Sequence, residues 1–295
     1  MQQTVITEKW LSGIGYEVAF WNNVYRWRHT YNGLMGWSNH GKTIALEGFD
    51  ANSWLLGREQ PTVLDVGAGM SYTVGNLLEK DGQQLPLHVR HVDPLARHFN
   101  RILRRYHKPL PDIDFGLAEY LSAFFGEEQA DLIVIQNALD HSSCPIKGIR
   151  EALRTLRVGG VLYLNHHPNE AETEHYKGFH QYNITADGGR LVIWNKHERH
   201  DIGQLTEGFA TVEVQVMEDS RHVVAVIRKT APLPPALFDD NADRRELCEV
   251  IVRLHASQQN IGRRLSYAWF NTLQCCAQAL PWEWKMKLKR LIRQA

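Results

Sequence analysis

Short apolar runs alternate with longer amphipathic stretches between residues 62 and 229. β-Branched and aliphatic side chains gather in seven runs of strand length. They predict strands at residues 62–66, 88–92, 113–115, 131–136, 161–166, 211–217 and 222–228. The stretches between them have helical periodicity, and they predict helices at residues 72–80, 95–106, 118–125 and 146–156.

Gly159 and Gly160 follow the last of these helices and are read as its stop signal. A strand, a helix and a second strand in succession form a right-handed crossover, which makes the two strands parallel. Only residues 218–221 separate the last two expected strands, which is too short for a helix, so that pair should be antiparallel. The pattern therefore predicts an α/β fold with a seven-stranded, mainly parallel sheet and a terminal antiparallel pair.

Three segments lie outside this alternation. Residues 1–60 are helical in pattern and hold five of the nine tryptophans, which predicts an aromatic-rich helical cap or lid. Residues 168–196 form an insertion whose Asp-Gly-Gly tripeptide at 187–189 predicts a hairpin. Residues 231–295 begin as a proline-rich linker and continue as a helical region, which leaves residues 61–230 as the core.

Composition adds few constraints. Hydrophobic residues make up 43% of the 295 residues, and Lys plus Arg equals Asp plus Glu at 33 each, so nucleic-acid binding is not indicated. Residues 1–10 lack the pattern of a secretory signal, and no apolar run reaches the length of a membrane span, so a cytoplasmic protein is expected. The four cysteines show neither metal-ligand spacing nor a disulfide framework, and reduced thiols are expected.

The first expected strand ends in VLDVGAG, residues 63–69. Gly67 and Gly69 therefore stand at the carboxyl edge of the sheet, where open α/β sheets bind ligands, and the missing Cβ atoms allow close approach. A dinucleotide site would carry a third glycine at position 72, but that residue is Tyr72. This weakens the phosphate interpretation and leaves S-adenosylmethionine (SAM) as the other candidate.

Five blocks in one order resemble the class I SAM-dependent methyltransferase family. They are VLDVGAG at 63–69, HVDP at 91–94, GLAEYL at 116–121, DLIVIQNALDH at 131–141 and LRVGGVLYL at 156–164. The resemblance implies a Rossmann-like fold, SAM as cofactor and S-adenosylhomocysteine as product.

The resemblance also implies roles for matching residues. Gly67 and Gly69 would lie against the methionine part of SAM, with Asp65 ordering the loop or meeting the amino group through water. Asp93 would accept hydrogen bonds from both ribose hydroxyls, which suits a carboxylate; the alternative is a turn-capping acid before Pro94. The implied cofactor residues are Asp65, Gly67, Gly69, Met70, Asp93, Pro94, Leu117, Ala118, Glu119 and Asn137.

Methyl transfer to a hydroxyl needs a base, and histidine is the usual one near neutral pH. The chain has 15 histidines, of which His141 is the leading candidate and His166 and His180 follow. Asp140 and Glu170 would orient such a base or bind a metal. The spacing of these residues predicts no metal site. For any single histidine, a structural role is the alternative.

The insertion, with NHHPNEAETEHYKGFHQYN before LVIWN, is similar to methyltransferases associated with bacterial cell-surface glycan assembly, such as O-antigen or capsule. The similarity implies a sugar acceptor, which aromatic rings would stack on and arginines would hold. The expected acceptor residues are Trp21, Tyr25, Arg26, His167, Asn169 and Glu170. Packing of an N-terminal helix onto the sheet is the alternative for the aromatic residues.

The chain ends in LPWEWKMKLKRLIRQA, and residues 244–295 hold ten basic residues against three acidic ones. A basic amphipathic helix with tryptophan fits the inner surface of an anionic membrane, and it fits a partner protein or second subunit equally. The resulting hypothesis is a SAM-dependent O-methyltransferase acting on a sugar hydroxyl of a surface polysaccharide or its precursor. Alternatives are N- or C-methylation of a small metabolite and a non-catalytic SAM-binding assembly subunit.

Overall fold

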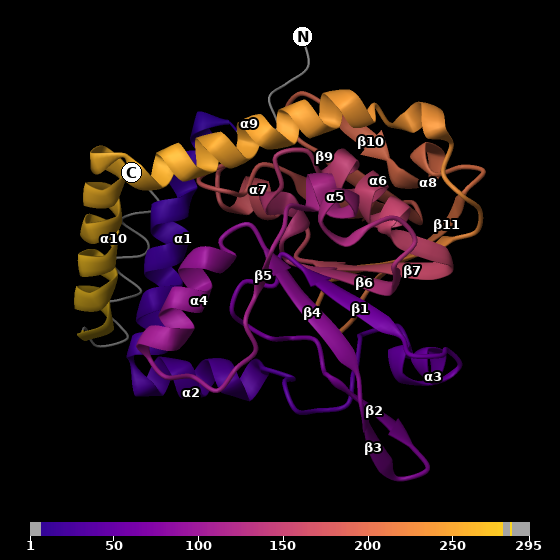
Figure 1. Ribbon diagram of the computed structural model, residues 1–295, viewed down its shortest axis with the longest axis horizontal. Helices are drawn as coiled ribbons and strands as arrows, with labels where there is room; N and C mark the ends of the chain where they lie inside the picture. The colour runs from indigo at the N-terminus through magenta and orange to yellow at the C-terminus, as the bar shows by residue number, and fades with distance from the viewer. Residues whose placement is uncertain (1–6, 280–283, 285–295) are drawn as a thin grey trace.

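A computed structural model describes residues 7–279 and Trp284 (Figure 1). Its main sheet has seven strands in the order β11-β12-β7-β6-β1-β4-β5. Neighbouring strands from β7 to β5 are parallel, whereas β12 is antiparallel to both β7 and β11, so the expected sheet and its terminal pair are confirmed. The strands are β1 (Thr62–Val66), β4 (His88–Asp93), β5 (Asp114–Phe115), β6 (Ala130–Gln136), β7 (Leu156–His166), β11 (Ala210–Val216) and β12 (Val223–Lys229).

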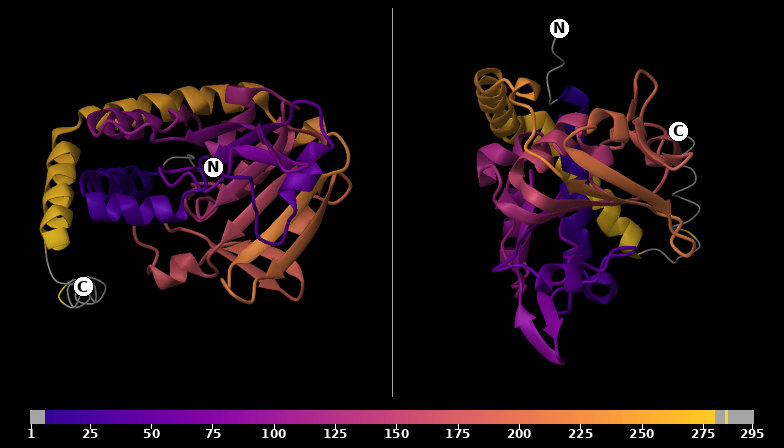
Figure 2. Two further views of the ribbon diagram at one scale, coloured as in Figure 1. Left: turned by 90° about the horizontal axis from the view of Figure 1, so that it is seen from below. Right: turned by 90° about the vertical axis from the view of Figure 1, so that its right-hand side faces the viewer.

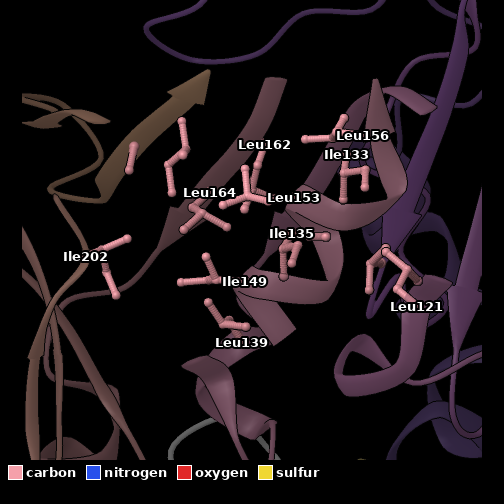
Figure 3. Packing of buried hydrophobic residues seen from close by; sticks show 14 of the residues in the cluster. Leu121, Ile133, Ile135, Leu139, Ile149, Leu153, Leu156, Leu162, Leu164 and Ile202 are labelled. Carbon is pink, nitrogen blue, oxygen red and sulfur yellow. The ribbon is translucent and has the colours of Figure 1, made fainter. Parts of the chain in front are cut away.

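Helices cover both faces of this sheet. The crossover helices are α4 (Ala96–Arg105), α5 (Leu121–Phe125) after the short η1 (Ala118–Tyr120), and α6 (Pro145–Thr155). Figure 3 shows Ile149 and Leu153 of α6 packed over Ile135, Leu162 and Leu164 of the sheet. The second face is covered by α3 (Ala51–Leu56), and burial of these apolar side chains on both faces drives the layered fold.

The helix expected at residues 72–80 is absent, and this prediction was wrong. After the glycine loop the chain turns and forms a hairpin of β2 (Leu77–Lys80) and β3 (Gln83–Pro86). The phenol of Tyr72 is buried against His91 and donates to the Pro111 carbonyl, which fixes Tyr72 at φ 51°. Leu77 then exchanges backbone hydrogen bonds with residues 42–44, which replace the bonds that a helix would make.

The helix stop expected at Gly159 and Gly160 was also wrong, because both residues lie inside β7. A Cβ on Gly160 would lie 2.9 Å from the Asp131 carbonyl oxygen, and Gly159 has φ +79°. The two glycines thus allow the close backbone approach and the register shift that occur in the β6–β7 pairing. Helix α6 ends earlier, at Thr155.

The insertion forms the expected hairpin, β8 (Asn183–Asp187) and β9 (Arg190–Trp194), after α7 (Glu170–Thr173). A third strand, β10 (Arg199–Asp201), pairs with β9 and leads to α8 (Ile202–Leu205). Buried residues of β8 and β9 belong to the same apolar cluster as α6, so the insertion shares a core with the main sheet.

The segments before β1 and after β12 meet on one side of the molecule (Figures 1 and 2). The N-terminal part contains α1 (Glu8–Arg26) and α2 (Arg28–Trp37). The C-terminal part contains η3 (Pro235–Leu237), α9 (Asp240–Gln259) and α10 (Ile261–Ala279), and α10 packs beside α1. The expected amphipathic helix at residues 280–295 lies outside the described residues, apart from Trp284.

Helix α9 is tied to the core by Lys147 of α6, whose ammonium lies 2.6 Å from Asp243 and 2.9 Å from Glu246. Within residues 7–279 and Trp284, no helix combines the length and apolar character needed to cross a bilayer.

Candidate active site

A cavity of about 1010 Å³ opens at the carboxyl ends of the central parallel strands. Four strand ends contribute, with the glycine loop after β1, Asp93 at the end of β4, Asn137 after β6 and His167 after β7. Helix α1 covers the cavity with Trp10, Glu17, Phe20 and Trp21. The expected residues that line it are Trp21, Gly67, Gly69, Asp93, Pro94, Leu117, Ala118, Glu119, Asn137, His141 and His167.

The glycine loop is held in a backbone conformation that other residues rarely adopt. Gly67 has φ +70° and Gly69 has φ +54°. A Cβ on Gly67 would collide with the methyl group of Ala138, and one on Gly69 would lie 3.1 Å from the Trp21 ring. The N–H groups of Gly67 and Ala68 donate to the Val92 carbonyl, which anchors the loop to β4.

Asp93 is 7% exposed and connects the loop to the next strand. Its Oδ1 accepts from the Leu95 N–H at 2.7 Å, and its Oδ2 accepts from the Gly69 N–H at 3.1 Å. Burial raises the pKa of Asp93 to about 7 despite these two bonds. The turn-capping role weighed as the alternative is therefore present, and the same carboxylate also lines the cavity.

Asp65 and Met70 are buried beneath the loop and do not line the cavity. Asp65 Oδ2 lies 2.9 Å from His91 Nδ1, so this buried acid joins β1 to β4 beneath the loop. The Met70 carbonyl accepts a hydrogen bond of 2.7 Å from the Tyr25 hydroxyl. Tyr25 is therefore a packing residue. Arg26 is exposed and lies over Trp27, so neither Tyr25 nor Arg26 reaches the cavity, and of the three acceptor residues expected in this segment only Trp21 lines it.

Glu119 uses its carboxylate to hold the loop after His141. Its Oε1 accepts from the Ser142 hydroxyl at 2.6 Å and from the Ser143 N–H at 2.9 Å. Leu117 and Ala118 present apolar surface to the cavity on the same side.

Asp140, His141 and His180 bring three polar atoms together. His180 Nδ1 lies 2.8 Å from Asp140 Oδ2 and 3.1 Å from His141 Nε2, and His141 Nε2 lies 3.5 Å from Asp140 Oδ2. Asp140 and His141 belong to η2 (Leu139–His141), whereas His180 comes from the insertion. The three atoms are close enough to hold a metal ion, an arrangement that sequence spacing did not predict.

Charge within this cluster is set by burial and by the short contacts. Burial acts to raise the pKa of Asp140, but His141, His180 and His166 hold it at about 2. Burial acts to lower the pKa of His180, and its hydrogen bond to Asp140 raises it on balance. Asp140, 4% exposed, is therefore an ionised carboxylate between histidines.

His166, Asn169 and Glu170 do not line the cavity within the described chain. His166 is 1% exposed, with Nδ1 3.9 Å from Asp140 Oδ1, and burial lowers its pKa to about 4. His166 is therefore not positioned to take a proton from an acceptor bound in the cavity. Asn169, at φ 55°, and Glu170 instead begin α7. His167 lies on the cavity wall, where its ring packs edge-on against His222 with 4.3 Å between ring centroids.

Several lining residues were missed from the sequence. Trp10 and Glu17 lie on the same side of α1 as Trp21, so a helical projection of this segment would have grouped them. The Trp10 indole donates to the His141 carbonyl at 2.9 Å, and the Trp21 indole donates to Glu17 at 2.7 Å. The others come from distant segments, and no local signal marks them; they are Trp37, Thr73, Gln136, Asn165, Phe179, Ser220 and His222.

Comparison with known protein families gives a match for the middle of the chain. Residues 64–164 match the family model described as a methyltransferase domain. This segment runs from β1 to β7 and contains the glycine loop, Asp93 and Asn137. It also contains Asp140 and His141. No curated protein matches the sequence.

Three solved structures illustrate the similarity of the chain path. One is the T. thermophilus 16S rRNA N2 G1207 methyltransferase in complex with AdoMet and guanosine, at 17% identity and TM-score 0.34, over 66% of this chain and 43% of that one. A second is the Burkholderia thailandensis 1,6-didemethyltoxoflavin-N1-methyltransferase with S-adenosylhomocysteine, at 19% and 0.35, over 61% and 75%. The third is a putative methyltransferase complexed with the Haloferax volcanii Trm112 methyltransferase activator, at 15% and 0.43, over 72% and 98%.

Identities and TM-scores at this level do not indicate an acceptor, and the matched region spans less than half the length of the first of these proteins. The family match and the sheet topology identify residues 64–164 as a SAM-dependent methyltransferase domain.

Proposed function

We propose that the protein is a SAM-dependent O-methyltransferase in which His141 takes the proton of an acceptor hydroxyl. One observation carries this proposal: the His141 side chain lines the same cavity as the glycine loop and Asp93, and its Nε2 lies among Asp140 and His180. His180 Nδ1 lies 3.1 Å from His141 Nε2 and 2.8 Å from Asp140 Oδ2, so His141 is positioned through His180 as well as by the nearby carboxylate, and a positioned histidine is the commonest general base.

In the proposed complex the cofactor spans the strand ends. Gly67 and Gly69 face its methionine part, Asp93 accepts from the ribose hydroxyls, and Leu117 with Ala118 lies along the adenine. Asn137, at φ 46° directly after β6, lines the methionine end and accepts from the His167 N–H at 2.9 Å. With the cofactor held in this order, its methyl group would lie toward His141, which lines the same cavity.

The reaction is an in-line displacement. The acceptor oxygen forms a bond to the methyl carbon, the carbon–sulfur bond breaks, and sulfur keeps the electron pair to give S-adenosylhomocysteine. His141 Nε2 faces Asp140, so Nδ1 is the nitrogen that receives the hydroxyl proton. The ionised Asp140 then stabilises the imidazolium, while the cavity walls supply orientation, which contributes up to about 7–11 kcal/mol in well-aligned systems.

The proposed acceptor is a sugar hydroxyl of a cell-surface polysaccharide or its precursor. Trp10, Phe20, Trp37 and Phe179 present aromatic surface to the cavity, and such faces stack on sugar rings. Phe179 and His180 belong to the insertion that resembles glycan methyltransferases in sequence. A basic segment at residues 280–295 would bring the enzyme to anionic lipid, and this part of the proposal rests on sequence alone.

The test is a transfer assay with methyl-labelled SAM and a panel of acceptors. Label recovered as an O-methyl sugar supports the proposal, and label on nitrogen or carbon of a small metabolite refutes it. SAM binding by calorimetry without turnover on any acceptor would indicate a non-catalytic assembly subunit. The membrane part is tested separately, by comparing full-length protein with a protein ending at residue 279 for sedimentation with anionic vesicles.

A further inference from the structure

A second cavity, of about 580 Å³, lies on the other side of α1. Its walls come from α1, α4, the end of α9 and the start of α10, and it shares no lining residue with the first cavity. Leu11, Ile14 and Val18 face this second cavity, whereas Trp10, Glu17 and Trp21 face the first. Helix α1 is therefore a common wall between two separate chambers.

Four arginines line the second cavity. Arg101 and Arg105 line it from α4, and Arg263 and Arg264 line it from α10. Among the described residues that line it there is no aspartate or glutamate. Four guanidinium groups around one space repel one another unless an anion lies between them.

Glu8, an acid close to Arg263, already forms ion pairs with two arginines. Glu8 accepts from Arg253 at 3.2 Å and from Arg263 Nη2 at 2.7 Å. Arg263 Nη1 is nevertheless buried without a hydrogen-bond partner in the described chain, and so is Nε2 of His98, which also lines the cavity. Buried donors of this kind are satisfied by a bound ligand or water. Burial, and to a smaller extent the adjacent Arg101 and Arg97, lower the pKa of His98 to about 4.

Apolar side chains also line this cavity, most of them from α1. Leu11, Ile14 and Val18 of α1 and Ile102 of α4 line it, and Leu11 and Ile102 are almost fully buried. The volume lies within the range of small-molecule sites, about 300–1,000 Å³. A small inorganic anion would leave this apolar surface without a partner.

We propose that the second cavity binds an anionic amphiphile, with a phosphate group between the four arginines and a hydrocarbon part against α1. A bidentate guanidinium–phosphate contact is the strongest recognition that these side chains offer. The chain's own C-terminal segment is not a suitable ligand for this cavity. Residues 285–293 carry five basic side chains, which the four arginines would repel. The ligand comes either from a membrane lipid or from a soluble phosphate ester.

Dodecyl phosphate is the probe, below its micelle concentration, with titration calorimetry on the full-length protein. Inorganic phosphate and uncharged dodecyl glucoside test the two halves of the ligand separately. We expect dodecyl phosphate to bind more tightly than either. Equal binding of dodecyl glucoside, or equal binding of inorganic phosphate, overturns the proposal.

The matched variants are Arg105→Gln/Arg264→Gln, which removes two exposed charges of the cavity, and Arg104→Gln. Arg104 is the neighbour of Arg105 on α4 but lies 3.8 Å from Asp112 and outside the cavity. The double variant should bind dodecyl phosphate roughly tenfold or more weakly, and Arg104→Gln should bind it like the wild type. Wild-type affinity in a folded double variant overturns the proposal.

Two further measurements complete the test. Co-sedimentation with phosphatidic acid vesicles that is lost in the double variant assigns the ligand to a membrane lipid, and binding of the soluble amphiphile alone assigns it to a free phosphate ester. SAM affinity and methyl transfer are measured on the same variants. Since neither arginine lines the first cavity, failure of amphiphile binding with normal transfer would count against this inference and leave the proposed function intact.

Discussion

The two ends of the first cavity are built in different ways. At the proposed cofactor end, Gly67, Gly69 and Asn137 follow strand ends within three residues, and Asp93 closes β4. At the acceptor end, Trp10, His141 and His180 come from α1, η2 and the insertion, and the hydrogen bond from Trp10 to His141 spans 131 positions. The first end is formed mainly by backbone that follows the strands, and the second end is formed by side chains that are far apart in the sequence.

This difference determines what a substitution can reveal. The cofactor end is fixed by backbone hydrogen bonds such as those from Gly67 and Ala68 to Val92, so changes there should alter folding and cofactor affinity together. The acceptor end depends on side-chain contacts around Asp140, so changes there should alter turnover and leave cofactor affinity in place.

The largest expected effect is on turnover at the acceptor end. His141→Asn removes the proposed base and should lower kcat by about 10²- to 10⁴-fold with little change in the SAM dissociation constant. His167→Asn is the control, because His167 lines the same cavity without touching Asp140, and it should lose far less activity. Steady-state kinetics and calorimetry check both. Normal kcat in His141→Asn would assign the base to another residue.

Zinc tests the same cluster without a mutation. Zn²⁺ held by Asp140, His141 and His180 would bind Nε2 of His141 and leave the proton on Nδ1, so no lone pair would face the acceptor. At saturation, Zn²⁺ should therefore match the loss seen in His141→Asn, and a chelator should restore activity. Stimulation of methyl transfer by a divalent metal would show instead that the cluster works as a metal centre.

A smaller effect is expected at the cofactor end from Gly67→Ala. The left-handed φ costs about 1–2 kcal/mol, and the collision with Ala138 adds about 1–3 kcal/mol. Gly188→Ala is the matched control, because Gly188 has φ +57° and no atom lies within 4 Å of its Cβ position. This variant should lose only the stability that the left-handed φ costs. Urea unfolding and SAM titration give both values. Equal losses in the two variants would mean that Ala138 moves aside freely.

The same contrast explains what the sequence could predict. VLDVGAG and HVDP carry their geometry in adjacent residues, so the sheet, the loop and Asp93 were all predictable. The absence of the helix at residues 72–80 was not, because the buried Tyr72 and the backbone of residues 42–44 decide it. Likewise Tyr25 and Arg26 look like acceptor residues in an aromatic segment, but the rotation of α1 turns Tyr25 into the core and Arg26 to solvent.

Asp93 should show a pH-dependent cofactor affinity. Its pKa is raised to about 7, so the carboxyl is largely neutral at pH 6 and ionised at pH 8. In the proposed complex the ionised form would accept from both ribose hydroxyls, so SAM should bind more tightly as pH rises through 7, by up to about 1.4 kcal/mol per pH unit below the pKa. Asp93→Asn should remove this dependence. A pH-independent wild-type affinity would argue against contact with the ribose.

The smallest expected effect concerns stability at the acceptor end. The lowered pKa of Asp140 contributes stability above its usual pKa near 4, and this is lost as pH falls toward 2. The raised pKa of His180 contributes stability below its usual value near 6.5, and this is lost as pH rises through the higher folded value.

Both contributions come from one ion pair, so Asp140→Asn should destabilise the protein most between about pH 4 and 6.5, by roughly 1–2 kcal/mol. Urea unfolding of the variant and the wild type at pH 3, 5 and 8 measures the difference. A difference that increases steadily to pH 8 would show that Asp140 stabilises the fold without a protonated His180. The acceptor end would then be held by neutral hydrogen bonds, as the cofactor end is by backbone ones.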